Sequence, residues 1–184
     1  MRDKMSSIDE VREHYIASWG APSFVQEFSS ASLEVVVFKW DLSSRTGGTT
    51  VYATYGVSGR LDAHGNRAEV FVGLIPDMDP ICLPLANLAA TVVAGGNDVR
   101  HGSTWDMGGP LWSGTELNFL VTLHQHSALA ALDSKVGRVE FFTAIPIFKY
   151  EADFKKSHGV DALTRHWKEN RVSFWDPTRL PGAI

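Results

Sequence analysis

The chain has 184 residues, a formal net charge of −4, 44% hydrophobic residues and 21% charged residues, the composition of an ordinary globular domain. This length is enough to bury a core within one domain, and the mild negative charge argues against a nucleic-acid binder, which usually carries a basic stripe. The single cysteine, Cys82, excludes an internal disulfide and fits a reducing compartment. The sequence shows no signal segment and no apolar run near the about 18 residues that span a bilayer, so we expect a cytoplasmic protein without a membrane partner.

The first predicted element is an amphipathic helix over residues 7–20. Ser7 and Glu10 have the spacing of a capping box, in which a hydroxyl and a carboxylate bind free backbone N–H groups at the start of a helix. Gly20 can close the helix. The apolar residues that recur at helical spacing are Ile8, Val11, Tyr15 and Trp19.

The middle of the chain is rich in β-branched and aromatic runs that predict strands. A turn at residues 62–66 lets the runs at 49–55 and 68–75 pair as neighbours. A largely buried helix is predicted over residues 84–94, with Pro84 in its first turn. The predicted strands cover residues 24–28, 33–40, 49–55, 68–75, 117–125 and 136–145.

The C-terminal third continues this strand pattern through Pro146 into two short helices. Gly159 can supply the positive φ that stops the first helix, and Asp161 favours the start of the second. Residues 171–184 read as an irregular tail. The order of elements predicts an α+β fold: a mostly antiparallel or mixed sheet flanked by helices, in a single domain over residues 1–184 with its core in 24–170.

Two histidines are candidate metal ligands. His124 and His126 lie two residues apart, so on a strand both imidazoles would face the same side. The alternative is a surface pair at a strand end, which we favour because the sequence suggests no third ligand. We therefore predict no metal and no other cofactor.

The loop from residue 97 to residue 114 is the chemically richest segment. It holds His101, Trp105, Asp106 and Trp112, but a serine triad is assembled across a fold rather than within one loop, and the glycines match no phosphate-binding motif. We therefore predict no catalytic residues. The tryptophans offer large contact areas to a protein partner; the alternative is that both pack the loop against the sheet.

Two carboxylates fall inside predicted strands. Glu69 and Glu140 each lie either on a solvated face or beside an arginine of a neighbouring strand, for which Arg67 and Arg138 are the candidates.

Several segments resemble the suppressor of fused domain family. The resemblance extends over roughly residues 25–170, and the last of the matching segments is the most specific. These segments are Tyr52–Ser58, Arg67–Pro76, the loop His101–Pro110, Thr143–Ile147 and the helix pair Lys156–Leu163. The sequence departs from the family pattern at Asp77-Met78-Asp79, where many members carry a tryptophan.

The resemblance implies a protein binder rather than an enzyme. Animal members are two-lobed regulators that sequester Gli-type transcription factors, whereas single-domain bacterial members resemble immunity proteins of toxin systems. It therefore implies a cytoplasmic bacterial immunity protein that binds and neutralises a cognate toxin domain. Partner-binding residues are predicted in the loop and, secondarily, at Asp77, Asp79, His124 and His126.

Two further hypotheses remain open. One is a metal-dependent or hydrolytic enzyme, which requires His101, Asp106, His124 and His126 to converge on one site. The other is a regulatory scaffold that dimerises through an exposed sheet edge.

Overall fold

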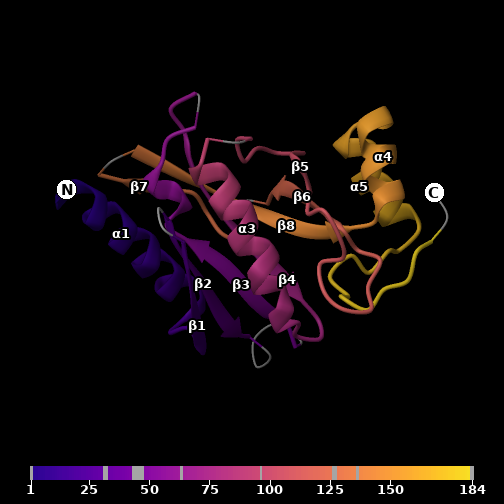
Figure 1. The fold of residues 1–184 in the computed structure, drawn as a ribbon, viewed down its shortest axis with the longest axis horizontal. Coiled ribbons are helices and arrows are strands. Elements are labelled where there is room, and N and C mark those ends of the chain that lie inside the picture. The colour runs from indigo at the N-terminus through magenta and orange to yellow at the C-terminus, as the bar shows by residue number, and fades with distance from the viewer. Residues whose placement is uncertain are drawn as a thin grey trace.

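One mixed sheet of eight strands organises the chain, in the order β1-β2-β3-β4-β8-β6-β5 with β7 paired to β8 (Figure 1). The computed structural model describes residues 2–30, 33–42, 48–62, 64–95, 97–125, 128–135 and 137–182, with 2–8, 30 and 33 described by secondary structure only. The strands are β1 Phe24–Ser30, β2 Leu33–Asp41, β3 Thr50–Tyr55, β4 Arg67–Leu74, β5 Thr104–Asp106, β6 Phe119–His124, β7 Leu132–Ser134 and β8 Gly137–Ile147. The helices are α1 Arg2–Trp19, α3 Cys82–Val93, α4 Lys149–His158 and α5 Val160–Glu169, with short 3-10 turns η1 Val57–Gly59 and η2 Asp79–Ile81.

The predicted α+β class, with a mixed sheet in one domain, is confirmed. β1 to β4 form consecutive antiparallel pairs, and β3 and β4 are the neighbours that the turn predicted. β4 then pairs with β8 in parallel, from Arg67 opposite Val139 to Phe71 opposite Thr143. β6 lies antiparallel between β8 and β5, so β4–β8 is the one parallel junction among the described strands.

Helices cover both faces of the sheet. Successive side chains of a strand point to opposite faces, so each strand divides its apolar residues between two layers. α3 packs on one face, α1 packs on the other, and α4 with α5 continues the second layer beyond α1 (Figure 1). β8 contributes to all three clusters: Phe142 and Ala144 with α3, Val139 and Phe141 with α1, and Ile145 and Ile147 with α4 and α5.

The N-terminal helix begins at Arg2, five residues before the predicted start at Ser7. The predicted capping box is therefore wrong. Glu10 lies inside α1, and its carboxylate accepts a hydrogen bond from the backbone N–H of Lys135 at 3.1 Å. This contact ties α1 to the hairpin between β7 and β8. Sequence spacing correctly identified the packed face, since Val11 and Tyr15 are fully buried.

Two short strands were not predicted. β5 lies in the segment expected to be a loop, and β7 lies in the connection between the last two predicted strands. Each has three residues, which is too short to display an alternating pattern. Both exist because a longer strand beside them supplies the backbone hydrogen bonds, β6 for β5 and β8 for β7.

The predicted irregular tail contains no helix or strand among residues 171–182, yet it is firmly attached. Arg179 and Glu151 form a buried ion pair, with Nη2 2.6 Å from Oε2 and Nη1 3.1 Å from Oε1. The same carboxylate accepts hydrogen bonds from the Trp167 indole at 2.7 Å and from the Phe148 backbone N–H at 2.9 Å. One carboxylate therefore joins the start of α4, the core face of α5 and the tail.

Pro146 is accommodated inside β8 by the same arginine. Its carbonyl accepts a hydrogen bond from Arg179 Nη2 at 3.0 Å, and therefore points away from the paired strand β6. The N–H and C=O of one residue lie on the same side of a strand. The proline ring thus occupies the side on which no ladder hydrogen bond is needed.

Gly159 ends α4 as predicted, with φ 88°, and its N–H donates to the carbonyl of Lys155 at 2.8 Å. The end of α5 also has a residue with positive φ, but this residue is not a glycine. There Arg171 has φ 52°, the Arg171 N–H donates to Lys168 and the Val172 N–H donates to Trp167. These two hydrogen bonds define a Schellman motif, whose left-handed residue is usually glycine.

Among the described residues, no helix is both long enough and apolar enough to cross a membrane.

Replacing Arg179 by alanine leaves the buried carboxylate of Glu151 without its cation, so we expect a loss of about 3–5 kcal/mol in the free energy of unfolding. Urea denaturation measures this loss. The matched control is Lys149→Ala, which removes the exposed pair with Asp153 on the same helix and should cost less than about 1 kcal/mol. Equal losses for the two variants would contradict the proposed role of Arg179.

Replacing Arg171 by glycine relieves a left-handed conformation that disfavours a Cβ, although glycine also gains freedom in the unfolded chain. We expect a net stabilisation of roughly 0.5–1 kcal/mol, measured as a higher midpoint of thermal or urea unfolding. Arg165→Gly in the middle of α5 is the control and should destabilise by about 1 kcal/mol.

Candidate functional site

A hollow of about 430 Å³ opens at the amino ends of β4 and β8. Four parts of the chain form it: the continuous stretch from η1 to the start of β4, the end of α3 with the segment that follows it, the end of β6, and the start of β8. We call it the histidine pocket. Its floor is Val57, Ala68, Val92, Val99 and Phe142, and its rim includes Arg60, Leu61, Asp62, His64, Asp98, Arg100, His101, His124 and Glu140.

The floor is positioned by the buried carboxylate of Glu69 on β4. Glu69 accepts hydrogen bonds from the backbone N–H groups of Gly56 and Ser58, both at 3.0 Å, and from the hydroxyls of Ser58 and Thr54, both at 2.7 Å. These bonds hold η1, including Val57, against the start of β4. The prediction of a solvated or arginine-paired Glu69 is therefore wrong, because neutral donors surround it; Arg67 instead donates to the Ser58 carbonyl at 2.6 Å.

Arg60 joins the pocket to the end of α3. Its Nη1 donates to the carbonyls of Val92, at 2.7 Å, and of Val93. Gly95 has φ 95° and lies against the guanidinium, so that a Cβ there would come within 3.1 Å of Nη2. The arginine thereby satisfies carbonyls that every helix leaves unpaired at its C-terminal end.

Two of the predicted histidines meet on the rim. The backbone N–H of His124 donates to Nδ1 of His101 at 3.1 Å, which places the hydrogen of the neutral His101 ring on Nε2. Nε2 of His124 lies 2.8 Å from Glu140, and Arg138 Nε lies 2.6 Å from the other oxygen of that carboxylate. Arg138 is thus the arginine beside Glu140, but it lies on the same strand, β8, and not on a neighbouring strand as predicted. Burial opposes ionisation of Glu140, but the hydrogen bonds from Arg138 and His124 hold its pKa below the ordinary value.

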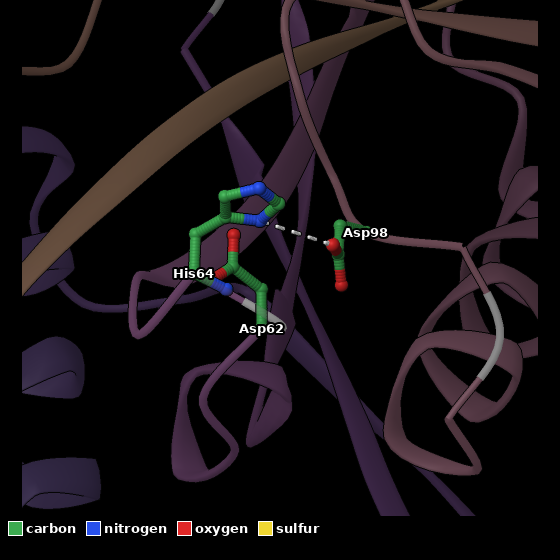
Figure 2. A group of neighbouring side chains, drawn as sticks. All are labelled: Asp62, His64 and Asp98. Atoms are coloured by element: carbon green, nitrogen blue, oxygen red, sulfur yellow. Dashed lines mark hydrogen bonds and ion pairs between the residues drawn. The ribbon is translucent and has the colours of Figure 1, made fainter.

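Asp62, His64 and Asp98 form a second group on the rim, with one potential ligand atom from each within 4.8 Å of the others (Figure 2). Each of the three side chains already has hydrogen-bond or ion-pair partners. Asp62 Oδ1 accepts the backbone N–H groups of His64 and Asn66 at 2.8 and 2.7 Å. Arg100 Nη2 lies 2.5 Å from His64 Nδ1 and 2.8 Å from Asp98. The Arg100 guanidinium therefore occupies the place between His64 and Asp98 that a metal ion would need. We interpret the group as ion pairs that hold the 62–66 turn, and not as a metal site.

The turn hydrogen bonds also affect acidity. Burial raises the pKa of Asp62, but the hydrogen bonds from Asn66 and His64 together outweigh it, so its pKa lies below the ordinary value. Asp62 therefore stays ionised and keeps the 62–66 turn closed at neutral pH.

The predicted tryptophans lie in and against the core. Trp105 on β5 is 5% exposed and pairs opposite Leu120, and its indole N–H has no acceptor among the described residues. Trp112 is half-buried against the same cluster. Asp106 is exposed, and it accepts the Gly108 N–H at 2.9 Å. Trp105 thus offers little surface to a partner, whereas Trp112 and Asp106 offer more.

Asp77 and Asp79 brace the segment after β4. Lys39 Nζ lies 3.2 Å from Asp77 and 2.5 Å from Asp79, and the Tyr52 hydroxyl donates to Asp79 at 2.8 Å. The hydrogen bond from Lys39 lowers the pKa of Asp79 below its ordinary value, against the opposing effect of burial. Both carboxylates remain more than half exposed.

The four residues required by the enzyme hypothesis are not gathered at one point. His101 contacts His124, but Asp106 pairs opposite Phe119 at the other end of β6. Phe119 and His124 are five residue steps apart along the strand, a distance of about 16 Å. His126 lies outside the described residues. The sequence did not indicate Arg60, Leu61 and Asp62, because nothing local predicts that residues 57–68 and 98–101 meet. Asp98 and Arg100 lie in the predicted contact loop but were not singled out in it.

Comparison with known proteins places this fold. The sequence model of the suppressor of fused protein family matches residues 29–180. The chain belongs to the suppressor of fused family. Among curated proteins, none matches the sequence significantly.

Solved suppressor of fused structures share the architecture. A homologue from Neisseria gonorrhoeae FA 1090 superimposes with a TM-score of 0.74 at 19% identity, over 98% of each chain. The crystal structure of the Sufu–Fu complex gives 0.65 at 13% identity, over 97% of this chain and 91% of that one. Drosophila Suppressor of Fused gives 0.64 at 14% identity, and this chain spans 50% of its length. At sequence identities this low, the similarity to these structures shows a shared fold only.

The buried carboxylate of Glu69 should make stability depend on pH. Burial raises its pKa from 4.5 to about 6, although the hydrogen bonds from Ser58, Thr54 and Gly56 oppose the rise. The folded protein therefore holds this proton more tightly than the unfolded chain does. This contribution to stability is complete below pH 4.5 and is lost as the pH rises through 6.

The matched variant is Glu69→Gln, which cannot titrate. Between pH 4.5 and 7, the free energy of unfolding of the wild type should fall by about 2 kcal/mol relative to that of the variant. Urea denaturation across this range measures the difference. The free energy of unfolding of the variant should also differ from that of the wild type by an amount that does not depend on pH, because the amide N–H groups of glutamine face hydrogen-bond donors. A difference between the two proteins that stays the same at every pH would contradict the assigned pKa.

Proposed function

We propose that this protein is a non-enzymatic, cytoplasmic protein-binding domain that neutralises a cognate toxin domain, as a bacterial immunity protein does. Its fold is the one seen in the crystal structure of the Sufu–Fu complex, which supports a protein as the partner. A net charge of −4 suits a basic partner, which it would attract by electrostatic steering.

The observation that carries the proposal is the composition of the histidine pocket. An apolar floor surrounded by charged groups of both signs is the anatomy of a specific protein interface, in which a buried centre is surrounded by a polar rim. Asp98, Arg100 and His101 come from the loop in which the sequence predicted the contact surface. Leu61 adds an apolar side chain that is 48% exposed at the rim.

The proposed mechanism is stoichiometric occlusion. An apolar or aromatic side chain of the toxin enters the pocket, and rim groups pair with polar groups around it, so that the domain covers the toxin's working surface. Asp106, Trp112, Asp77 and Asp79 serve as secondary contacts. The aspartates keep negative charge facing solvent even while bound to Lys39.

The first experiment is co-expression with the toxin-like reading frame that neighbours the gene. We expect protection of the cells and a complex of the two proteins that co-purifies at a fixed stoichiometry. A toxin that kills equally with and without this protein, together with no co-purifying complex, would sink the proposal.

The second experiment locates the contact surface. Leu61→Asp places a charge at the pocket rim without touching the core, and we expect it to weaken the toxin complex at least about tenfold in a binding titration. Leu83→Asp is the matched control, since Leu83 on α3 is 55% exposed and does not line the pocket. Equal affinities of the two variants would show that the partner binds elsewhere.

A further inference from the structure

A second hollow, of about 340 Å³, lies where the end of α5 meets the end of β6. Its wall is aromatic. Trp167 is buried, Phe174 packs against it with ring centroids 5.4 Å apart, and Trp175 meets Phe174 edge-on at 5.0 Å. Trp175 itself remains 43% exposed. The size is at the lower end of the range for small-molecule pockets. We call it the tryptophan pocket.

Charge at the mouth of this pocket is of one sign. Lys168 and Arg171 line it, and the other polar lining residues are Gln125 and Thr164, which are neutral. Within the described part of the chain, no acidic residue lines the hollow, and the side chains of Lys168 and Arg171 have no ion-pair or hydrogen-bond partner. An apolar cavity with two free cations at its mouth is complementary to an anion with an apolar body.

The backbone at Arg171 supports a role for its side chain. Arg171 holds the left-handed position of the Schellman motif with φ 52°, where glycine fits without strain. Helix termination alone therefore favours glycine at this position. Strain of this kind is tolerated where a side chain has another task.

We propose that the tryptophan pocket binds a small organic anion. Its flat apolar body lies against Trp167, Phe174 and Trp175, and its carboxylate or sulfonate pairs with Arg171 and Lys168. Arginine suits this task because its planar fork can bind both oxygens of a carboxylate at once. The site is separate from the histidine pocket and does not depend on the identity of the protein partner.

The test compares 2-naphthoate with its neutral analogue 2-naphthylmethanol, each titrated into the full chain by calorimetry with ligand-observed NMR as a second readout. We expect the anion to bind at least about tenfold more tightly than the neutral compound, and its affinity to fall as salt is raised. Trp175→Ala should weaken the binding of both ligands, because it removes part of the aromatic wall that both contact.

Arg171→Gly distinguishes the role of the arginine side chain in binding from the role of the backbone turn in stability. We expect the variant to unfold at a higher temperature than the wild type and yet to bind 2-naphthoate about tenfold more weakly. A loss of binding in a more stable protein is not a folding defect. Lys168→Gln should also weaken binding. Arg165→Gln is the matched control, since it removes the same charge from α5 outside the pocket and should leave the affinity unchanged.

Three results would overturn the proposal. The first is equal affinity for the anion and the neutral compound. The second is unchanged affinity for 2-naphthoate in Arg171→Gly, which would show that the Arg171 side chain does not contact the ligand. The third is no binding of 2-naphthoate at about 1 mM, a concentration at which even weak pockets are occupied.

Discussion

The register of β8 is the constraint on which the rest of the structure depends. This strand pairs with β4 on one side and with β6 and β7 on the other, and all three apolar clusters meet on it. A shift of one residue would exchange its two faces. Phe141 and Ile145 would then turn toward α3, and the charged Glu140 would enter the core beneath α1. The same register brings Phe142 and Glu140 to the histidine pocket, so the pairing of β8 determines both the core and the pocket.

Two buried carboxylates are stabilised in opposite ways. Glu69 is surrounded by neutral donors and keeps a raised pKa, whereas Glu151 is neutralised by Arg179. A carboxylate held only by neutral groups can still gain a proton at mildly acidic pH. One held by an arginine loses its cation only if the tail detaches. The pocket floor therefore depends on pH, and the C-terminal cluster depends on the position of the tail.

Local patterns in the sequence were enough to predict much of the fold. Runs of β-branched and aromatic residues identified β2, β3 and β4, and Gly159 stopped α4 where a positive φ was expected. The start of α1 could not be found, because Glu10 bonds to a hairpin 125 residues away rather than capping its own helix. The pocket was missed for the same reason. His101 and His124 become neighbours only once β5 pairs with β6, and His64 meets Asp98 only once η1 has docked.

The Glu151–Arg179 pair also sets an order of events during synthesis. Glu151 leaves the ribosome 28 residues before its arginine. Until those residues have emerged, packing α4 and α5 on β6 and β8 would bury the Glu151 carboxylate without its cation, which makes that packing less stable. Domains generally fold from the N-terminal side as they are made. In this protein the layer beneath α1 is therefore expected to close before the layer beneath α4 and α5, which gains its full stability only with Arg179 in place.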